Sequence, residues 1–208
     1  MTKVTLITGG SRGIGAATAR LSAAEGHAVA INYRSDATAA EKVRAEVESV
    51  GAKAMVVQAD TGVESDIMHM FEEVDRNLGT VTGLVNNAGI HGPRGRLDAL
   101  SAGDIDRVLE VNVRGCFLCA REAIKRMSTK HGGAGGSIVN VSSGSARLGN
   151  PNDGVLYAAS KGAVNSLTIG LSQEVAGEGI RINTVAPGLT ATDMPPPDKL
   201  ETQGPGIP

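Results

Sequence analysis

The sequence predicts an α/β protein whose core is a doubly wound parallel sheet, and two observations carry that prediction. Short apolar runs rich in β-branched residues alternate along the chain with longer segments of helical pattern. A glycine-rich loop, "TGGSRGIG" at residues 8–15, follows the first apolar run directly and opens the first helical segment. Strands that alternate with helices of this length imply right-handed crossovers and a sheet covered on both faces.

Six apolar runs are predicted to be strands, with helices between them. The strands are expected at Val4–Ile7, Ala28–Asn32, Ala54–Gln58, Gly83–Asn86, Ser137–Val141 and Arg181–Ala186. The helices are expected at about 13–25, 37–50, 64–78, 102–130 and 157–178. Six strands connected in this way suit a Rossmann-type sheet of order 3-2-1-4-5-6, in which ligands bind beyond the carboxyl ends of the strands.

Length and composition bound the classes of function. The chain has 208 residues, of which 41% are hydrophobic and 20% charged, as expected for a single globular domain over residues 1–192. The net charge is −2 and the basic residues are scattered, so neither nucleic acid nor a membrane is an expected partner. The first strand begins too early to leave room for a signal peptide, which makes the cytoplasm the expected location. The four histidines lie far apart, so no metal site is expected.

Two composition features concern the middle and the end of the chain. Cys116 and Cys119 form a C-x-x-C inside a predicted amphipathic helix, and we expect them to pack in the core rather than act as a redox pair. Six of the eight prolines fall at or after Pro187. The segment 193–208 is therefore expected to be a mobile substrate loop or tail without a regular helix.

The loop after the first strand has the composition of a phosphate-binding turn. Gly9, Gly13 and Gly15 let the chain turn tightly, bring the backbone close to a pyrophosphate, and let helix and strand pack closely. The helix N-terminus that follows presents unpaired N–H groups and the positive end of its dipole. The sequence therefore predicts a dinucleotide site here.

The end of the second strand indicates which dinucleotide is bound. Sites for NAD usually place an acidic residue there to hold the ribose 2′-hydroxyl, whereas Asn32, Tyr33 and Arg34 stand at this turn, and Asp36 lies slightly too far along. Arg34 is expected to reach a 2′-phosphate, and Arg12 adds a second positive charge nearby. Taken alone, each arginine is explained equally well as a solvated surface charge. The two together favour NADP(H) over NAD.

One of the two tyrosines of the chain precedes a lysine by one helical turn. Tyr157 and Lys161, in "VLYAASKGAV", share a helix face. An ammonium close to a phenol favours the phenolate, so the pKa of Tyr157 is expected to fall from about 10 toward the range useful for proton transfer. A chance helical pair is the alternative, because this spacing alone is common.

Together, these motifs resemble those of the short-chain dehydrogenase/reductase family, in the family's order from residue 4 to about residue 192. The matching segments are "TGGSRGIG" at 8–15, "QAD" at 58–60, "NNAG" at 86–89, "VNV" at 111–113, "NVSS" at 140–143, "YAASK" at 157–161 and "APG" at 186–188. The resemblance implies cofactor contacts from Gly9, Ser11, Arg12, Gly13, Ile14, Gly15, Arg34, Asp60, Asn87, Ala88, Gly89, Tyr157, Lys161, Pro187 and Gly188.

The same resemblance implies four catalytic roles. Tyr157 is the expected general acid that protonates a carbonyl oxygen, or the base in the reverse direction, and Lys161 is expected to depress its pKa and hold the nicotinamide ribose. Ser143 is expected to donate a hydrogen bond to the substrate oxygen, and Asn112 to hold a water that links Lys161 to solvent. Of the two adjacent serines, Ser143 is chosen over Ser142, which is expected to point away because strand neighbours alternate faces.

The resemblance therefore implies an NADP(H)-dependent oxidoreductase that acts on a carbonyl or secondary alcohol, with 3-oxoacyl thioesters or sugars as candidate substrates. Glu174 and Glu178, near the end of the Tyr157 helix, argue against an acidic acyl carrier. Arg94 and Arg96 near the expected pocket mouth are either solvated or available to an anionic substrate. A catalytically silent NADP-binding regulatory module is the alternative from another class.

Two further expectations concern the end of the chain and its assembly. Members of the family usually continue with a covering loop, a helix and a seventh strand, for which these 208 residues contain no matching segments. A truncation, missing segments and a natural short form are the competing explanations. The sixth strand is then expected to be an unpaired edge. The helices at 102–130 and 157–178 are expected to pair in a homodimer or homotetramer.

Overall fold

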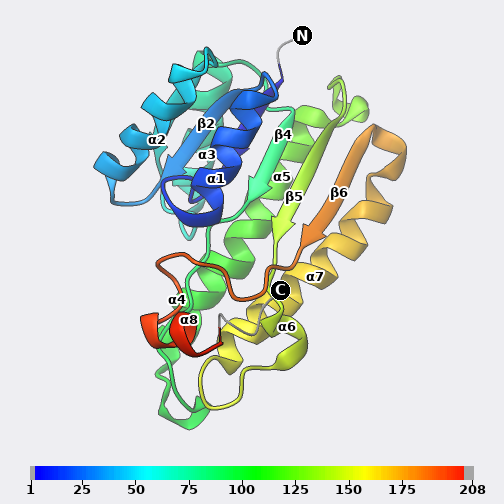
Figure 1. Cartoon of the computed structure of the whole chain (residues 1–208). Coiled ribbons are helices and arrows are strands. Elements are labelled where there is room, and N and C mark those ends of the chain that lie inside the picture. Colours follow the sequence, from blue (N-terminus) through cyan, green and yellow to red (C-terminus); the bar gives the residue numbers. More distant parts are fainter. Residues whose placement is uncertain (1–2, 204–208) are drawn as a thin grey trace.

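The computed structural model describes residues 3–203 and contains one six-stranded parallel sheet. Its strands are β1 (Val4–Ile7), β2 (Ala28–Tyr33), β3 (Ala54–Gln58), β4 (Gly83–Asn86), β5 (Gly136–Val141) and β6 (Ile180–Val185). They lie in the order β3-β2-β1-β4-β5-β6, and every neighbouring pair is parallel. The predicted fold class and strand order are confirmed, and each predicted strand lies within one residue of the observed one (Figure 1).

Helices cover both faces of the sheet and divide the core in two. α1 (Gly13–Ala24) and α2 (Ala37–Ser49) pack on one face, where Ile7 belongs to their cluster. α3 (Glu64–Asn77), α5 (Gly115–Met127) and α7 (Val155–Glu174) lie on the other, where Leu6 joins the larger cluster (Figure 1). Because successive strand residues face opposite sides, buried β1 contributes to both cores.

The predicted helix 102–130 is wrong as a single element. The chain forms α4 (Ala102–Leu109), then a π-helical turn at Glu110–Arg114, then α5. The turn contains Asn112, whose side chain bonds the backbone of the loop after β4. π-turns of this kind often accompany functional sites, because the extra residue re-aims a side chain.

Three short helices were not predicted from the sequence, namely the 3-10 turn Leu97–Ala99, α6 (Ser145–Leu148) and α8 (Pro197–Gln203). Two predicted helices end earlier than expected: α5 stops at Met127 and α7 at Glu174, and separate 3-10 turns follow at Thr129–His131 and Ala176–Glu178. The expectation that the proline-rich segment contains no helix is wrong for α8. A proline is compatible with the first helical position, where the backbone N–H has no intrahelical partner, and no proline follows within the helix.

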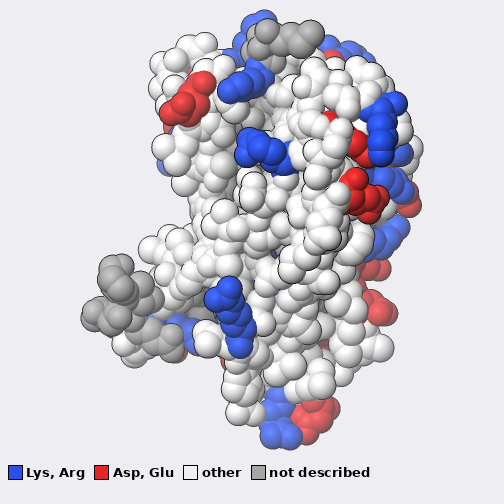
Figure 2. All heavy atoms as spheres, turned by 90° about the vertical axis from the view of Figure 1, so that its right-hand side faces the viewer, with Lys and Arg blue, Asp and Glu red and all other residues white. Residues whose placement is uncertain are grey.

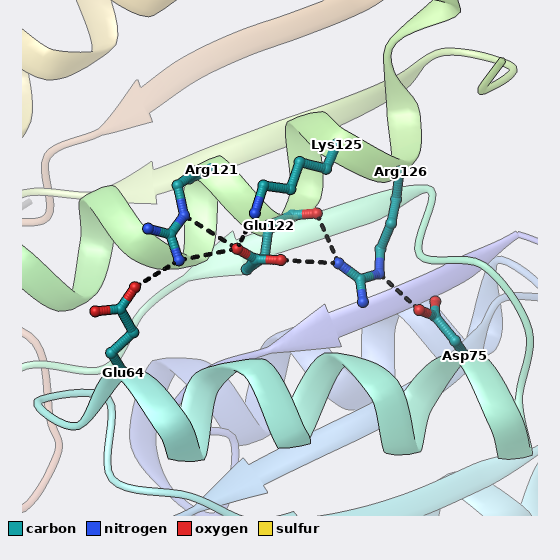
Figure 3. A network of polar contacts seen from close by, with 6 residues as sticks. All are labelled: Glu64, Asp75, Arg121, Glu122, Lys125 and Arg126. Carbon is teal, nitrogen blue, oxygen red and sulfur yellow. Dashed lines mark hydrogen bonds and ion pairs between the residues drawn. The ribbon is translucent and has the colours of Figure 1, made fainter. Parts of the chain in front are cut away.

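A polar network on the outer side of the larger core joins α3 to α5 (Figure 3). Glu122, buried on α5, accepts hydrogen bonds from Arg121, Lys125 and Arg126. Arg126 also donates to Asp75 of α3 at 2.7 Å. Its guanidinium lies 4.9 Å from the centre of the Phe71 ring. The side chain of Arg126 thus contacts two carboxylates and the face of an aromatic ring.

Replacing Arg126 by alanine should lower the free energy of unfolding by about 2–3 kcal/mol, because two partly buried carboxylates lose a shared cation. The side chain of Arg126 is only 17% exposed. Arg121→Ala is the matched control: that side chain is 42% exposed and its loss should cost less than about 1 kcal/mol. Urea denaturation measures the free energy of unfolding of both variants. Equal losses would show that the contacts of Arg126 contribute no more to stability than those of the exposed Arg121.

Candidate active site

The backbone of the glycine loop after β1 has a shape that lets other atoms come close to it. Gly9 and Gly13 have φ of +61° and +53°, a region that suits glycine. A Cβ on Gly15 would lie 2.4 Å from the carbonyl oxygen of Gly9, so α1 begins directly against the loop. No side chain caps the N-terminus of α1, and its first turn carries no acidic residue. Its N–H groups therefore suit an anion.

The segment after β4 holds the glycine loop in place through hydrogen bonds. The amide of Asn87 donates to the carbonyl oxygens of Thr8 and Gly9 at 2.9 and 3.0 Å. The hydroxyl of Thr8 accepts hydrogen bonds from the backbone N–H groups of Asn87 and Ala88, each at 3.0 Å. A Cβ on Gly89 would lie 3.3 Å from both Asn112 Oδ1 and Lys161 Nζ. The segment therefore connects the glycine loop to the residues expected to be catalytic.

Asn32 has a structural role that the sequence did not reveal. The side chain is buried; its Oδ1 accepts from Gly9 N at 3.0 Å, and its Nδ2 donates to the carbonyl oxygens of Val57 and Ala59 at 3.3 and 3.0 Å. It thereby ties the glycine loop to the end of β3. Because its amide is occupied by the backbone, Asn32 is not placed to bind a ribose.

A cavity of about 600 Å³ lies beyond the ends of β2 and β3. Its lining consists of polar side chains, namely Arg34, Gln58, Asp60, Ser65, Asp66 and His69. Arg12 is not among them, and its Nη1 lies 3.7 Å from Asp193 Oδ2 with both side chains well exposed. The structure thus separates the two arginines that the sequence pairs: Arg34 faces the cavity and Arg12 faces the segment after β6.

Asp60 is held as an anion in that cavity. Burial tends to raise its pKa, but hydrogen bonds from Gly62 N at 2.8 Å and Arg107 Nη2 at 2.6 Å more than offset this, and the pKa lies below its usual value. The backbone N–H of Asp60 donates to Asp66. The part of the cavity lining that Asp60 forms is therefore fixed by an ion pair with Arg107.

Tyr157 and Lys161 lie together on α7, beside the carboxyl end of β5. They are 8% and 4% exposed, and Lys161 Nζ lies 5.8 Å from the centre of the tyrosine ring. The same Nζ donates to the carbonyl oxygen of Val141 at 2.7 Å. Burial lowers the pKa of Lys161 to about 8.

The expected fall in the pKa of Tyr157 is not found. Burial of the phenol raises its pKa, and the hydrogen bond with Ser143 offsets only part of that rise. Desolvation disfavours the phenolate because the ion loses water that the protein does not fully replace. At neutral pH, Tyr157 is therefore a protonated hydrogen-bond donor.

The two adjacent serines have different partners. Ser142 is buried, and its hydroxyl donates to the carbonyl oxygen of Lys161 at 3.0 Å. The Oγ of Ser143 accepts a hydrogen bond from Ser145 N at 3.1 Å and lies beside Tyr157. Pro187 approaches the same region, since its carbonyl oxygen accepts from Gly144 N at 2.9 Å. The predicted serine and the "APG" turn thus meet next to the tyrosine.

Asn112 fixes the loop after β4. Its Oδ1 accepts from Ile90 N and its Nδ2 donates to Ile90 O, both at 2.8 Å; Nδ2 also donates to Ser160 at 3.0 Å. The side chain is almost fully buried. Through its hydrogen bonds it joins the loop after β4 to α7. Of the remaining predicted residues, Ser11 lies in the glycine loop, Ile14 in the first turn of α1, and Gly188 directly after Pro187.

His91 is a residue of this region that the sequence analysis missed. Its ring stacks on Tyr157, with centroids 5.0 Å apart and an interplanar angle of 21°. Nearby, Asp153 accepts hydrogen bonds from Arg94 and Lys199, each at 2.7 Å. The signal available in the sequence was an aromatic side chain directly after "NNAGI" in a chain with few aromatic residues.

Three further features of residues 3–203 concern the cysteines, metal-ligating groups and helix hydrophobicity. Cys116 and Cys119 are buried free thiols, and burial raises the pKa of Cys116 to about 12, so the packing role is confirmed. Among the described residues, no group of histidine, cysteine and carboxylate side chains could hold a metal ion. None of the helices in that range combines the length and apolar character of a membrane span.

Comparison with known proteins places this geometry in a family. The family model described as short chain dehydrogenase matches residues 3–202. The chain is 52% identical to an uncharacterized oxidoreductase of Escherichia coli (strain K12), covering 92% of this chain and 77% of the relative. It is 37% identical to a 3-oxoacyl-[acyl-carrier-protein] reductase of Staphylococcus aureus, covering 93% of this chain and 77% of that protein.

Solved structures agree with this assignment. A short chain dehydrogenase of Burkholderia cenocepacia in complex with NADP has a TM-score of 0.87 and 42% identity, covering 97% of this chain and 80% of that one. A dehydrogenase/reductase of Sinorhizobium meliloti has a TM-score of 0.90 and 38% identity, covering 100% and 81%. From its fold, its motifs and these relatives, the chain is a member of the short-chain dehydrogenase family.

Proposed function

We propose that this chain is an NADP(H)-dependent oxidoreductase that transfers hydride between nicotinamide and a carbonyl or secondary alcohol, with Tyr157 as the acid–base group. The observation that carries the proposal is the buried Tyr157–Lys161 pair beside Ser143, next to a braced glycine loop. A silent cofactor-binding module does not need this set. The presence of this set therefore argues against the silent module.

The residues present fit NADP(H). The uncapped N-terminus of α1 suits the pyrophosphate, and Arg34 lines a cavity large enough for the adenosine end and its 2′-phosphate. The Burkholderia relative was solved with NADP, and a metagenomic blue fluorescent protein with a TM-score of 0.87 and 38% identity was solved with NADPH. The cofactor would supply the hydride, while the protein supplies orientation and electrostatics.

The protein's own residues would manage the proton. In the reductive direction, the protonated phenol of Tyr157 donates to the substrate oxygen, and Ser143 donates a second hydrogen bond as negative charge develops there. Lys161, charged below its pKa of about 8, stabilises the phenolate that remains. Because the pKa of Tyr157 is raised, reduction at neutral pH begins with the required proton in place.

The pH dependence follows from the lysine. The value of kcat/KM for carbonyl reduction should fall as pH rises through about 8, because Lys161 then loses the proton that makes it cationic. A pH profile of NADPH oxidation measures this, and Lys161→Met should leave only a low residual activity whose profile shows no break at about pH 8. A flat reductive profile across that range would remove the ammonium from the mechanism.

The segment 189–203 is proposed to cover the substrate. A Cβ on Gly13 would lie 3.2 Å from the methyl group of Thr192, so the segment passes over the glycine loop. Further along, Arg94 donates to Met194 O at 3.3 Å, and Lys199 donates to Asp153. Figure 1 shows the segment crossing beyond the carboxyl ends of the strands. It therefore spans from the glycine loop to Arg94 and Asp153.

Among substrates, 3-oxoacyl thioesters are proposed first. The objection from Glu178 is weakened, because this carboxylate is buried, accepts from Ser128 at 2.5 Å and pairs with Lys130 at 2.6 Å. Glu174 stays exposed. A 3-oxoacyl-[acyl-carrier-protein] reductase is among the relatives. Sugar-derived carbonyls remain the second candidate.

A substrate panel tests the proposal directly. NADPH oxidation should be measured against NADH over aldehydes, ketones, 3-oxoacyl thioesters and sugar-derived carbonyls. Turnover that prefers NADPH supports the assignment. Binding of NADPH without turnover on any compound would favour the regulatory module.

A homodimer through α4, α5 and α7 is also proposed. Leu109, Phe117 and Ile169 are large apolar side chains exposed on these helices. A hollow of about 310 Å³ at the α4–α5 junction is lined by Leu109 among others, and no predicted site residue lines it. Figure 2 shows acidic and basic residues interspersed on the β6 side, with an uncharged centre. Sedimentation equilibrium should give twice the 21.2 kDa of the chain, and a monomer mass would contradict the proposal.

A further inference from the structure

The imidazole of His91 lies against the tyrosine proposed to be catalytic. The two rings are stacked with centroids 5.0 Å apart, and the histidine side chain is only 12% exposed. Stacked aromatic pairs restrict each other's rotation and exclude water from the shared face. Lys161 Nζ lies 5.8 Å from the centre of the same tyrosine ring, and Tyr157 is only 8% exposed. The ring of Tyr157 is thus bounded by named side chains rather than by solvent.

The backbone on both sides of His91 is held in place. Ile90 is bonded through both its N–H and its carbonyl oxygen to the side chain of Asn112. Gly92 has φ of +76°, and a Cβ there would lie 2.6 Å from Val108 Cγ2. The neighbours of His91 therefore allow it little movement. A residue that positions another side chain needs a backbone held in place in this way.

The helix that carries Tyr157 leaves room for this ring. Gly154 is the residue before α7, and a Cβ on it would lie 2.7 Å from both Cε1 and Nε2 of His91. Its φ of −156° lies outside the left-handed region, so space rather than backbone conformation explains the glycine. The lack of a side chain at Gly154 thus leaves space for the imidazole beside the tyrosine.

Burial, more than the neighbouring charges, keeps the imidazole of His91 neutral. Burial, and then the positive charge of Arg94, lower its pKa, while the carbonyl oxygen of Gly92 and Asp153 act in the opposite direction. Nε2 lies 3.9 Å from Asp153 Oδ2, and that carboxylate is already occupied by Arg94 and Lys199. A neutral imidazole offers the phenol no full charge, and the contact between the two side chains is the stacking of their rings.

We propose that His91 is a positioning residue: its imidazole, admitted by Gly154, holds the ring of Tyr157 in the orientation that proton transfer requires. The inference rests on the proposed function, because the orientation matters only if Tyr157 is the acid. The position of the ring is set in the first turn of α7, after a turn in which Asn150 and Asn152 have positive φ. Small misplacements of a reacting group are costly in rate.

Replacement of His91 separates stacking from hydrogen bonding. His91→Ala should lower kcat about tenfold while KM changes less than about threefold, because the acid is misplaced but binding is kept. His91→Phe retains a stacked ring without ring nitrogens and should recover kcat to within about threefold. If phenylalanine fails as badly as alanine, the ring nitrogens and not the stacking carry the role, and the proposal is overturned.

A double-mutant cycle tests the assigned space. Gly154→Ala should lower kcat because the new Cβ displaces the imidazole, and the same change should have little effect in a His91→Ala background. Additive losses would mean that Gly154 acts on α7 itself. That result contradicts the role assigned to Gly154.

The phenol itself provides a readout that does not depend on turnover. The chain has no tryptophan and only two tyrosines, so in a Tyr33→Phe background the phenolate absorbance on pH titration reports Tyr157 alone. His91→Ala should lower the titration midpoint, because opening the ring to water removes the burial that raises the pKa of Tyr157. His91→Phe should leave the midpoint unchanged.

The titration keeps the two hypotheses apart. An unchanged midpoint in His91→Ala would show that the imidazole does not shield Tyr157, and this overturns the inference whatever the activity. A lowered midpoint together with full turnover in Tyr157→Phe would instead refute the proposed function. In that case the contact is real, but it positions no acid, and the positioning role falls with the mechanism.

Discussion

Replacing Tyr157 by phenylalanine should lower kcat about a hundred- to ten-thousandfold while the Kd for NADPH changes less than about threefold. The change removes only the hydroxyl group. The ring should keep its place against His91, and Lys161 keeps its hydrogen bond to Val141 O. Single-turnover NADPH oxidation gives the rate, and a fluorescence titration of NADPH gives the affinity.

The other tyrosine supplies a matched control. Tyr33→Phe removes the same hydroxyl from the end of β2 and should leave kcat within about twofold, because Tyr33 packs against the core on the α1–α2 face. Three outcomes are informative. Full turnover in Tyr157→Phe would remove this phenol as the proton donor, equal losses in both variants would point to a general effect, and an inactive parent chain would favour the silent module.

The fold was predictable because its signals are local. Each strand is a short apolar run bounded by turn residues, and the alternation of strands and helices leaves few topologies open. The break in the helix at 110–114 is different. "EVNVR" contains nothing that ends a helix, and the π-turn accompanies the bonds between Asn112 and Ile90, which come from a distant loop. The residues of this segment alone therefore do not indicate the π-turn.

The site shows the same division. The spacing of Tyr157 and Lys161, and the glycines of the loop, are visible in the sequence because they reflect a helix turn and a backbone requirement. The direction of the tyrosine's pKa shift was wrong, because it depends on burial by other elements. The buried bracing role of Asn32 and the stacking of His91 likewise join residues that the sequence keeps far apart.

Replacing Arg34 by aspartate should reverse the preference between the two cofactors. NADPH affinity should fall about a hundredfold or more, because a charge-assisted bond to the 2′-phosphate is replaced by repulsion. NADH affinity should change only a few fold, since its adenosine ribose carries no phosphate. Arg34 lines the cavity beyond β2 and β3 together with Asp60, which is already paired with Arg107. Arg34 is therefore the lining cation not committed to that pair.

Two companion variants show which part of the effect is electrostatic. Arg34→Ala removes the attraction without adding repulsion and should weaken NADPH binding by an intermediate amount, with a shallower salt dependence than the parent chain. Arg12→Ala should have a smaller effect, because Arg12 is exposed beside Asp193 and does not line the cavity. Titrations of both cofactors at low and high salt measure these differences. Equal losses of NADPH and NADH affinity in Arg34→Asp would mean that Arg34 supports the cavity wall and does not select the phosphate.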